Sequence, residues 1–162
     1  MPRTIFLYAL LISLLIAGCS PSSTPEPLKT PTTEVHASTL PALNGDWTIK
    51  MRHSGGIMGL SRSVEVSSDG KFTVVDERTD KTIKGNLSAD ELLKINEKVT
   101  SAEYIPAVKP DGMVCADCFI YDLEIQRNGE KFAVQLNDIS LPNSGLESLV
   151  TYLRGLIDTA LK

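Results

Sequence analysis

Two cysteines separated by two residues, Cys115 and Cys118, are the part of the sequence best suited to chemistry. Such a pair can close a disulfide, exchange electrons with other thiols or supply two ligands to a zinc ion. In thiol oxidoreductases the pair opens a helix, whose N-terminus lowers the pKa of the attacking thiol, whereas Phe119 here continues into a predicted strand. Zinc would require two more ligands, and only His53 or carboxylates are available. The pattern therefore favours a structural disulfide, with a redox pair and a metal site as alternatives.

The usual signatures of catalysis and cofactor binding are missing from the sequence. It has no His-Glu-x-x-His zinc motif, no Gly-x-Ser-x-Gly elbow and no phosphate loop. A pair of His53 with Ser54 as base and nucleophile is disfavoured, because adjacent residues of a strand point to opposite faces. We therefore predict a protein without enzymatic activity, cofactor or metal.

Residues 54–60 form an apolar loop that contains three glycines between two predicted strands. In one interpretation Ile57 and Leu60 fold back over the end of the core. In the other the loop is exposed, and Met58 adapts to the irregular surface of a partner. Both interpretations are consistent with the sequence.

The N-terminal residues have the features of an export signal. Arg3 supplies a positive charge, and an apolar run of about a dozen residues follows, which is short for a membrane span. The run ends at Leu15-Ile16-Ala17-Gly18-Cys19, which resembles the lipobox of bacterial lipoproteins. A secretory signal with a chance cysteine at its end is the alternative.

The lipobox resemblance implies that residues 1–18 are removed as a signal peptide and that Cys19 becomes the N-terminus. Cys19 would carry diacylglyceryl and usually a third acyl chain such as palmitate, and more than one chain gives stable anchoring. The protein is then expected to be exported and lipid-anchored to the cell membrane. Ser20, in place of an aspartate, favours the outer membrane if the organism has one.

Charge excludes some partners. The 162-residue chain has a formal charge of −4, and loss of Arg3 with the signal peptide leaves −5. Without a cluster of Lys and Arg, nucleic acid is not an expected partner, and the lipid alone must hold the protein at the membrane. An exported protein meets oxidising conditions, in which Cys115 and Cys118 can pair.

The composition divides the rest of the chain in two. Residues 19–44 are rich in Pro, Ser and Thr and lack aromatic residues, so we predict a disordered linker. Residues 45–162 are long enough for a single domain with a core of its own.

Periodicity predicts the elements of this domain. Residues that alternate in polarity indicate strands near 46–53, 63–66, 72–74, 82–87, 119–127 and 132–136. Asp69-Gly70 and Asn128-Gly129 are typical of hairpin turns. Apolar residues at helical spacing predict helices from Ser88 to near Tyr104 and from Leu146 to Ala160. We therefore expect an α+β domain with an antiparallel β-sheet, two helices packed on one face and the order ββββ-α-ββ-α.

Residues 47–66 also resemble the start of emfourin-like proteins, which are small inhibitors of thermolysin-like metallopeptidases. The similar features are a first strand from Trp47, a Ser-Gly-Gly-apolar loop and a second strand, and the layout of the later elements is similar as well. The lipobox, the linker and the cysteine pair depart from that pattern. The resemblance implies a non-enzymatic protein that blocks the cleft of a zinc peptidase, with candidate contacts at Gly55, Gly56, Ile57, Met58 and Leu60.

Overall fold

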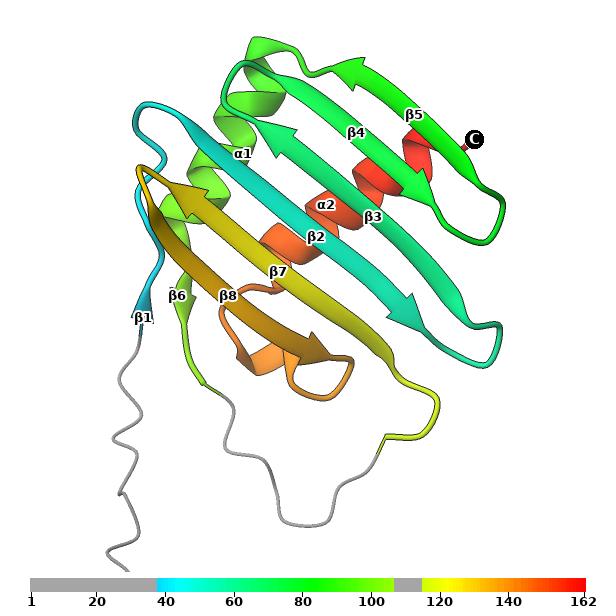
Figure 1. Ribbon diagram of the computed structural model, residues 1–162. Coiled ribbons are helices and arrows are strands. Elements are labelled where there is room, and N and C mark those ends of the chain that lie inside the picture. The colour runs from blue at the N-terminus through cyan, green and yellow to red at the C-terminus, as the bar shows by residue number, and fades with distance from the viewer. Residues whose placement is uncertain (1–37, 107–114) are drawn as a thin grey trace, which may run out of the picture. The chain divides into compact units, whose positions relative to one another are not determined.

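The computed structural model describes residues 38–106 and 115–162, so the predicted signal peptide, Cys19 and the linker before residue 38 lie outside the described residues. The chain folds into a six-stranded antiparallel sheet with two α-helices (Figure 1), which confirms the predicted α+β class. The sheet order is β5-β4-β3-β2-β7-β8. Its strands are β2 (Trp47–Gly55), β3 (Leu60–Ser67), β4 (Lys71–Asp76), β5 (Lys81–Asn86), β7 (Phe119–Arg127) and β8 (Glu130–Asn137).

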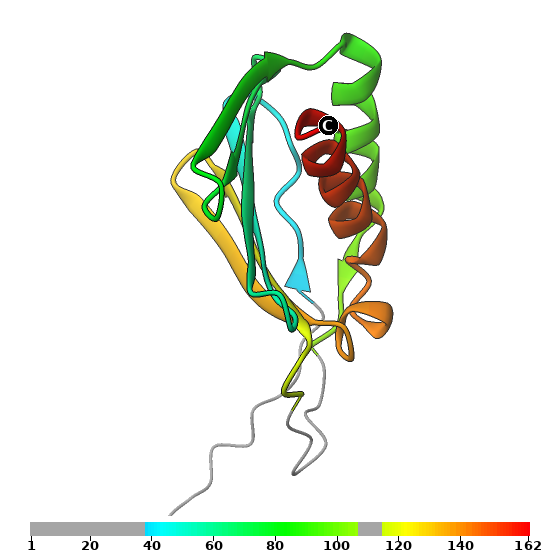
Figure 2. The ribbon, with the colours of Figure 1, turned by 90° about the vertical axis from the view of Figure 1, so that its right-hand side faces the viewer.

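The helices α1 (Ala89–Ser101) and α2 (Glu147–Ala160) lie along one face of the sheet and leave the other face open (Figure 2). A short 3-10 helix, η1 (Leu141–Asn143), precedes α2. The core lies between the two layers, and β2 shows the alternation of buried and outward side chains that its sequence predicts. Fully buried members from the sheet and the helices include Ile49, Val66, Val74, Ile125, Ile95, Val150, Leu153 and Ile157.

The predicted turn and cap signals form, with one difference. Asn128 and Gly129 both adopt positive φ, as a two-residue hairpin requires. At Asp69-Gly70 only Gly70 does so, and the connection from β3 to β4 has three residues. Ser88 and Glu91 make the reciprocal hydrogen bonds of a capping box at the start of α1.

The folded part begins earlier than the predicted boundary at residue 45. Ser38–Thr39 form a short strand, β1, that pairs with β6 (Glu103–Tyr104), and Leu40 and Leu43 are buried in the core. The predicted linker 19–44 is therefore wrong at its C-terminal end, and α1 ends at Ser101 because the chain turns into β6. Both differences arise from one pairing between distant segments, which local sequence patterns do not reveal.

The described residues include no helix with both the length and the apolar character needed to span a membrane.

Candidate functional site

Three connections lie side by side at one end of the sheet (Figure 1). Strands β3, β2, β7 and β8 are consecutive neighbours, and their ends are in register, since Gly55 pairs with both Leu60 and Phe119. On the far side of β7, Ile120 pairs with Asn137, the last residue of β8. This end therefore carries the β2–β3 loop (residues 56–59), the disulfide segment (residues 115–118) and the β8–η1 turn (residues 138–140).

The β2–β3 loop presents its apolar side chains to solvent. Ile57 is 86% exposed and Met58 is 74% exposed, whereas Leu60 is half-buried at the start of β3. The sequence left two interpretations open, and the structure agrees with the exposed loop. Ile57 does not fold back over the core. Two large apolar side chains next to each other at the tip of a loop make this the most exposed apolar part of the described residues.

The base of the loop is closely packed against the start of β7. The Gly56 amide donates a hydrogen bond to the carbonyl oxygen of Cys118 at 3.2 Å. A Cβ atom on Gly55 would lie 2.5 Å from the same oxygen, and one on Gly56 would lie 2.7 Å from the Phe119 ring. Both glycines also have positive φ, at 97° and 68°. A side chain at position 55 would collide with backbone, and one at position 56 would require the Phe119 ring to move, so this loop conformation strongly favours glycine at both positions.

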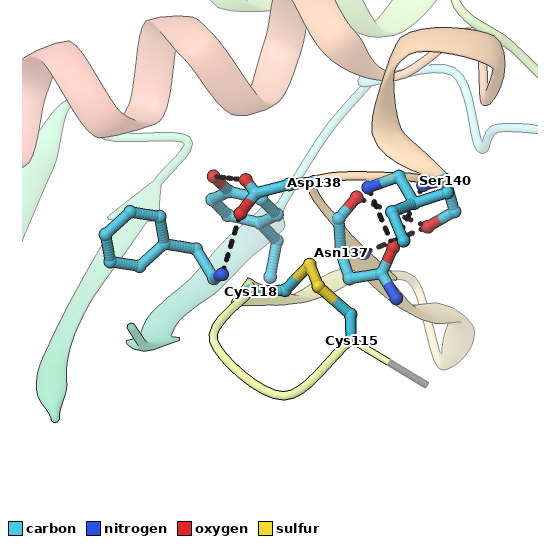
Figure 3. The surroundings of a disulfide bond; sticks show 8 residues. Cys115, Cys118, Asn137, Asp138 and Ser140 are labelled. Atoms are coloured by element: carbon cyan, nitrogen blue, oxygen red, sulfur yellow. Dashed lines mark hydrogen bonds between the residues drawn. A yellow bond between two sulfur atoms is a disulfide. The ribbon is translucent and has the colours of Figure 1, made fainter. Parts of the chain in front are cut away.

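Cys115 and Cys118 form a disulfide with their Cα atoms 5.5 Å apart. Strand β7 begins at the next residue, Phe119, as predicted, so neither cysteine lies at a helix N-terminus that would lower its pKa. Figure 3 shows the disulfide next to Asn137, the last residue of β8, and next to Asp138 and Ser140 of the turn that follows. The disulfide segment thus lies between the β2–β3 loop and the β8–η1 turn.

Asp138 links the turn after β8 to β7 through two hydrogen bonds. Its carboxylate accepts hydrogen bonds from the Phe119 amide at 2.8 Å and from the Tyr121 hydroxyl at 2.9 Å. The Tyr121 hydroxyl also accepts a hydrogen bond from Arg154 of α2 at 3.3 Å. Burial, together with the hydrogen bond to Asp138, raises the pKa of Tyr121 to about 12. The tyrosine is therefore a neutral hydrogen-bond donor at any physiological pH.

His53 is buried behind these residues on the helix side of the sheet. Its ring stacks on Tyr121, with centroids 5.0 Å apart, and meets the edge of Phe119 at 4.8 Å. Its Nε2 atom has no hydrogen-bond partner within the described part of the chain. Burial, assisted by the positive charge of Arg154, lowers the pKa of His53 from 6.5 to about 4. His53 is thus an uncharged packing residue at neutral pH, and it does not pair with Ser54.

The open face of the sheet has a hollow of about 590 Å³. Most of its charged side chains are already paired: Lys50 with Glu65 at 3.3 Å, Arg52 with Glu77 at 3.2 Å, and Glu124 at 2.8 Å with Lys131, which does not line the hollow. Asp122 accepts a hydrogen bond from Gln135 at 2.7 Å. Paired charges offer little to an incoming ligand, so this hollow is a weaker candidate than the loop end.

Within residues 38–106 and 115–162, no three side chains of His, Cys, Asp or Glu gather closely enough to hold a metal ion. Neither protein-family models nor curated protein sequences match this chain. The site therefore has to be interpreted from its own geometry.

The structure brings the predicted loop residues together with the predicted disulfide, an arrangement that the sequence did not indicate. Sequence reasoning also missed Asp138 and the packing role of His53. Both depend on which strands are neighbours, and the only local signal was the alternation that placed Tyr121 on the inward side of its strand.

Proposed function

We propose that this protein is a lipid-anchored envelope protein whose folded domain is a non-enzymatic binding module, and that it inhibits a thermolysin-like metallopeptidase. The lipobox-like segment ending at Cys19 supports the anchor, and the resemblance of residues 47–66 to emfourin-like inhibitors supports the class of partner. The observation that carries the binding role is the exposure of Ile57 and Met58 on a loop with a rigid base. In this proposal the loop enters a partner's cleft and buries both side chains.

The geometry of the loop suits inhibition, because the loop would lose little conformational entropy when it binds. At the base of the loop, the hydrogen bond from the Gly56 amide to the Cys118 carbonyl already fixes Gly56. Across the tip, the Gly59 amide donates a hydrogen bond to the Gly56 carbonyl at 2.9 Å. A preorganised loop loses less conformational freedom in the complex, which increases affinity. The apolar tip then contributes the contact energy, as anchors at interface hot spots do.

The test is inhibition by the mature chain, solubilised in detergent, against several thermolysin-like peptidases. The double variant Ile57→Ala with Met58→Ala should lose binding, since each anchor is expected to contribute about 2 kcal/mol or more. Its melting temperature should stay close to that of the unchanged protein, because exposed substitutions shift stability by only about 0.5 kcal/mol. Leu93→Ala is the matched control, as Leu93 is 65% exposed on α1.

Two results would contradict the proposal. The unchanged protein would fail to inhibit any of the enzymes, or the double variant would inhibit as well as Leu93→Ala does. A drop in stability for the double variant, of the roughly 2 to 5 kcal/mol typical of buried residues, would show instead that the loop is part of the core in solution.

A further inference from the structure

We propose that the partner-binding surface is composite: the disulfide segment and the β8–η1 turn belong to it together with the β2–β3 loop, and the Cys115–Cys118 disulfide holds the three in their binding arrangement. The partner that fits is a folded protein with an apolar cleft for Ile57 and Met58 and an adjoining apolar wall for Ile139. This inference rests on the proposed binding function, and it adds a dependence on the state of the disulfide.

Exposed apolar side chains gather at this end of the sheet. Among the described residues, five large hydrophobic side chains are markedly exposed. Three of them belong to the connections at this end of the sheet: Ile57 and Met58 on the β2–β3 loop, and Ile139, 41% exposed, on the β8–η1 turn. Apolar side chains from separate parts of the chain at one end of a molecule indicate a surface broader than one loop.

A single peptide group joins the β2–β3 loop to the β8–η1 turn. The carbonyl of the Cys118–Phe119 peptide accepts the hydrogen bond from Gly56 at 3.2 Å, and the N–H of the same peptide donates to Asp138 at 2.8 Å. Because a peptide group is planar, any rotation of this group disturbs both hydrogen bonds together. The orientation of the β2–β3 loop and that of the β8–η1 turn are therefore linked.

The disulfide lies directly before this peptide group in the chain. It closes a ring that begins at Cys115 and ends at Cys118, the residue whose carbonyl supports Gly56. The ring limits the backbone conformations available to Cys118 and so holds the linking peptide (Figure 3). Reduction by a dithiol breaks the S–S bond, transfers two electrons and two protons to give two thiols, and leaves the dithiol as its own disulfide. Cys118 then loses one of its constraints.

The experiment compares four forms of the mature chain in detergent: unchanged, Cys115→Ser with Cys118→Ser, Ile139→Ala and Leu93→Ala. Inhibition constants are measured with the most strongly inhibited thermolysin-like peptidase, and the serine variant avoids adding a reductant to a zinc enzyme. We expect the serine variant and Ile139→Ala each to bind about tenfold more weakly, as a lost interface contact of this kind would, and Leu93→Ala to bind unchanged. Amide hydrogen exchange at Gly56 should be faster in the serine variant than in the unchanged protein.

The outcomes separate this inference from the proposed function. Full binding by both the serine variant and Ile139→Ala, together with loss of binding in the Ile57/Met58 double variant, would leave the loop as the whole surface and overturn the composite one. If amide hydrogen exchange at Gly56 is equally fast in the serine variant and the unchanged protein, the proposed role of the disulfide is overturned, even when Ile139→Ala binds more weakly. Absence of inhibition by the unchanged protein would overturn the proposed function and the composite surface with it, and faster exchange at Gly56 would then support only the structural part.

Discussion

Gly55 and Gly59 both adopt positive φ at the ends of the same loop, but the space around them differs. A Cβ atom on Gly59 would meet nothing within 4 Å, whereas one on Gly55 would lie 2.5 Å from the backbone oxygen of Cys118. The conformational cost alone is about 1 to 2 kcal/mol for a residue with a side chain. Gly55 adds to this a collision with backbone that has little freedom to move.

We therefore expect Gly59→Ala to lower the free energy of unfolding by about 1 to 2 kcal/mol and Gly55→Ala to lower it by clearly more. Urea unfolding of both variants measures the difference, and each serves as the reference for the other. Equal losses at the two positions would mean that the close contact between Gly55 and Cys118 is absent in solution.

His53 predicts a dependence of stability on pH. Its pKa is about 4 in the folded protein and near 6.5 when unfolded, so between these values the unfolded chain binds more protons. Stability should therefore fall as the pH drops from about 6.5 towards 4, and at about 1.4 kcal/mol per unit of pKa the total loss approaches about 3 kcal/mol. The charges around the ring are those of Arg154, Asp158, Asp138 and Arg62.

The variant His53→Phe keeps an aromatic ring in the stack but removes the titration. We expect its stability to change less than that of the unchanged protein between about pH 6.5 and about pH 5, as measured by urea unfolding at each pH. In that range the acidic groups with lowered pKa values, such as Asp76 and Glu91, remain ionised and contribute little. Parallel pH profiles for the two proteins would show that His53 is not buried uncharged.

At the scale of elements, the disulfide segment is expected to be structural. The ring that it closes is short, so reduction should cost the fold only about 2 kcal/mol by loop entropy. Because β7 rather than a helix follows Cys118, no helix N-terminus activates a thiol. We expect no free thiol at these positions in the native protein, and no reduction of insulin by the dithiol form at rates typical of thioredoxins. Thiol titration with and without denaturant, and an insulin reduction assay, measure these two properties.

Elements whose signals are local could be predicted from the sequence. The capping box at Ser88 depends on residues three apart, and alternation in β2 or β7 reports burial on one face, so these elements formed near their predicted bounds. The two-residue turn at Asn128-Gly129 is local in the same sense. The turn at Gly70 also depends on residues outside the segment. There the connection has three residues, and of Asp69 and Gly70 only Gly70 has positive φ.

The rest required knowledge of which strands are neighbours. Nothing near Ser38 indicates that it pairs with Tyr104, and nothing near Asp138 indicates that it binds Phe119 and Tyr121. The sequence also left open whether Ile57 is buried or exposed, because burial depends on what lies beyond the end of the sheet. The candidate site was therefore predicted as a loop but not as a surface made of three connections.

At the scale of the whole molecule, the folded part has one helix-covered face, one open face with paired charges, and one end with exposed apolar loops. This division suits a module that binds through its end. The net charge of the chain is −4, and its sequence has no cluster of Lys and Arg of the kind that anionic lipid attracts. This charge is consistent with the proposal that lipid on Cys19, and not attraction between charges, holds the protein at a membrane.

We accordingly predict that the mature protein begins at a lipidated Cys19. Two or more acyl chains, at about 0.8 kcal/mol per buried methylene, should keep it in the membrane fraction through a high-salt wash that removes proteins held by charge. Mass spectrometry of the N-terminal peptide from that fraction should show cleavage after Gly18 and the added mass of the lipid. Cys19→Ser should leave an uncleaved precursor, whereas Cys115→Ser, the matched control, should be processed normally. A soluble product cut elsewhere, with an unmodified Cys19, would contradict the anchor and make the protein a freely diffusing exported one.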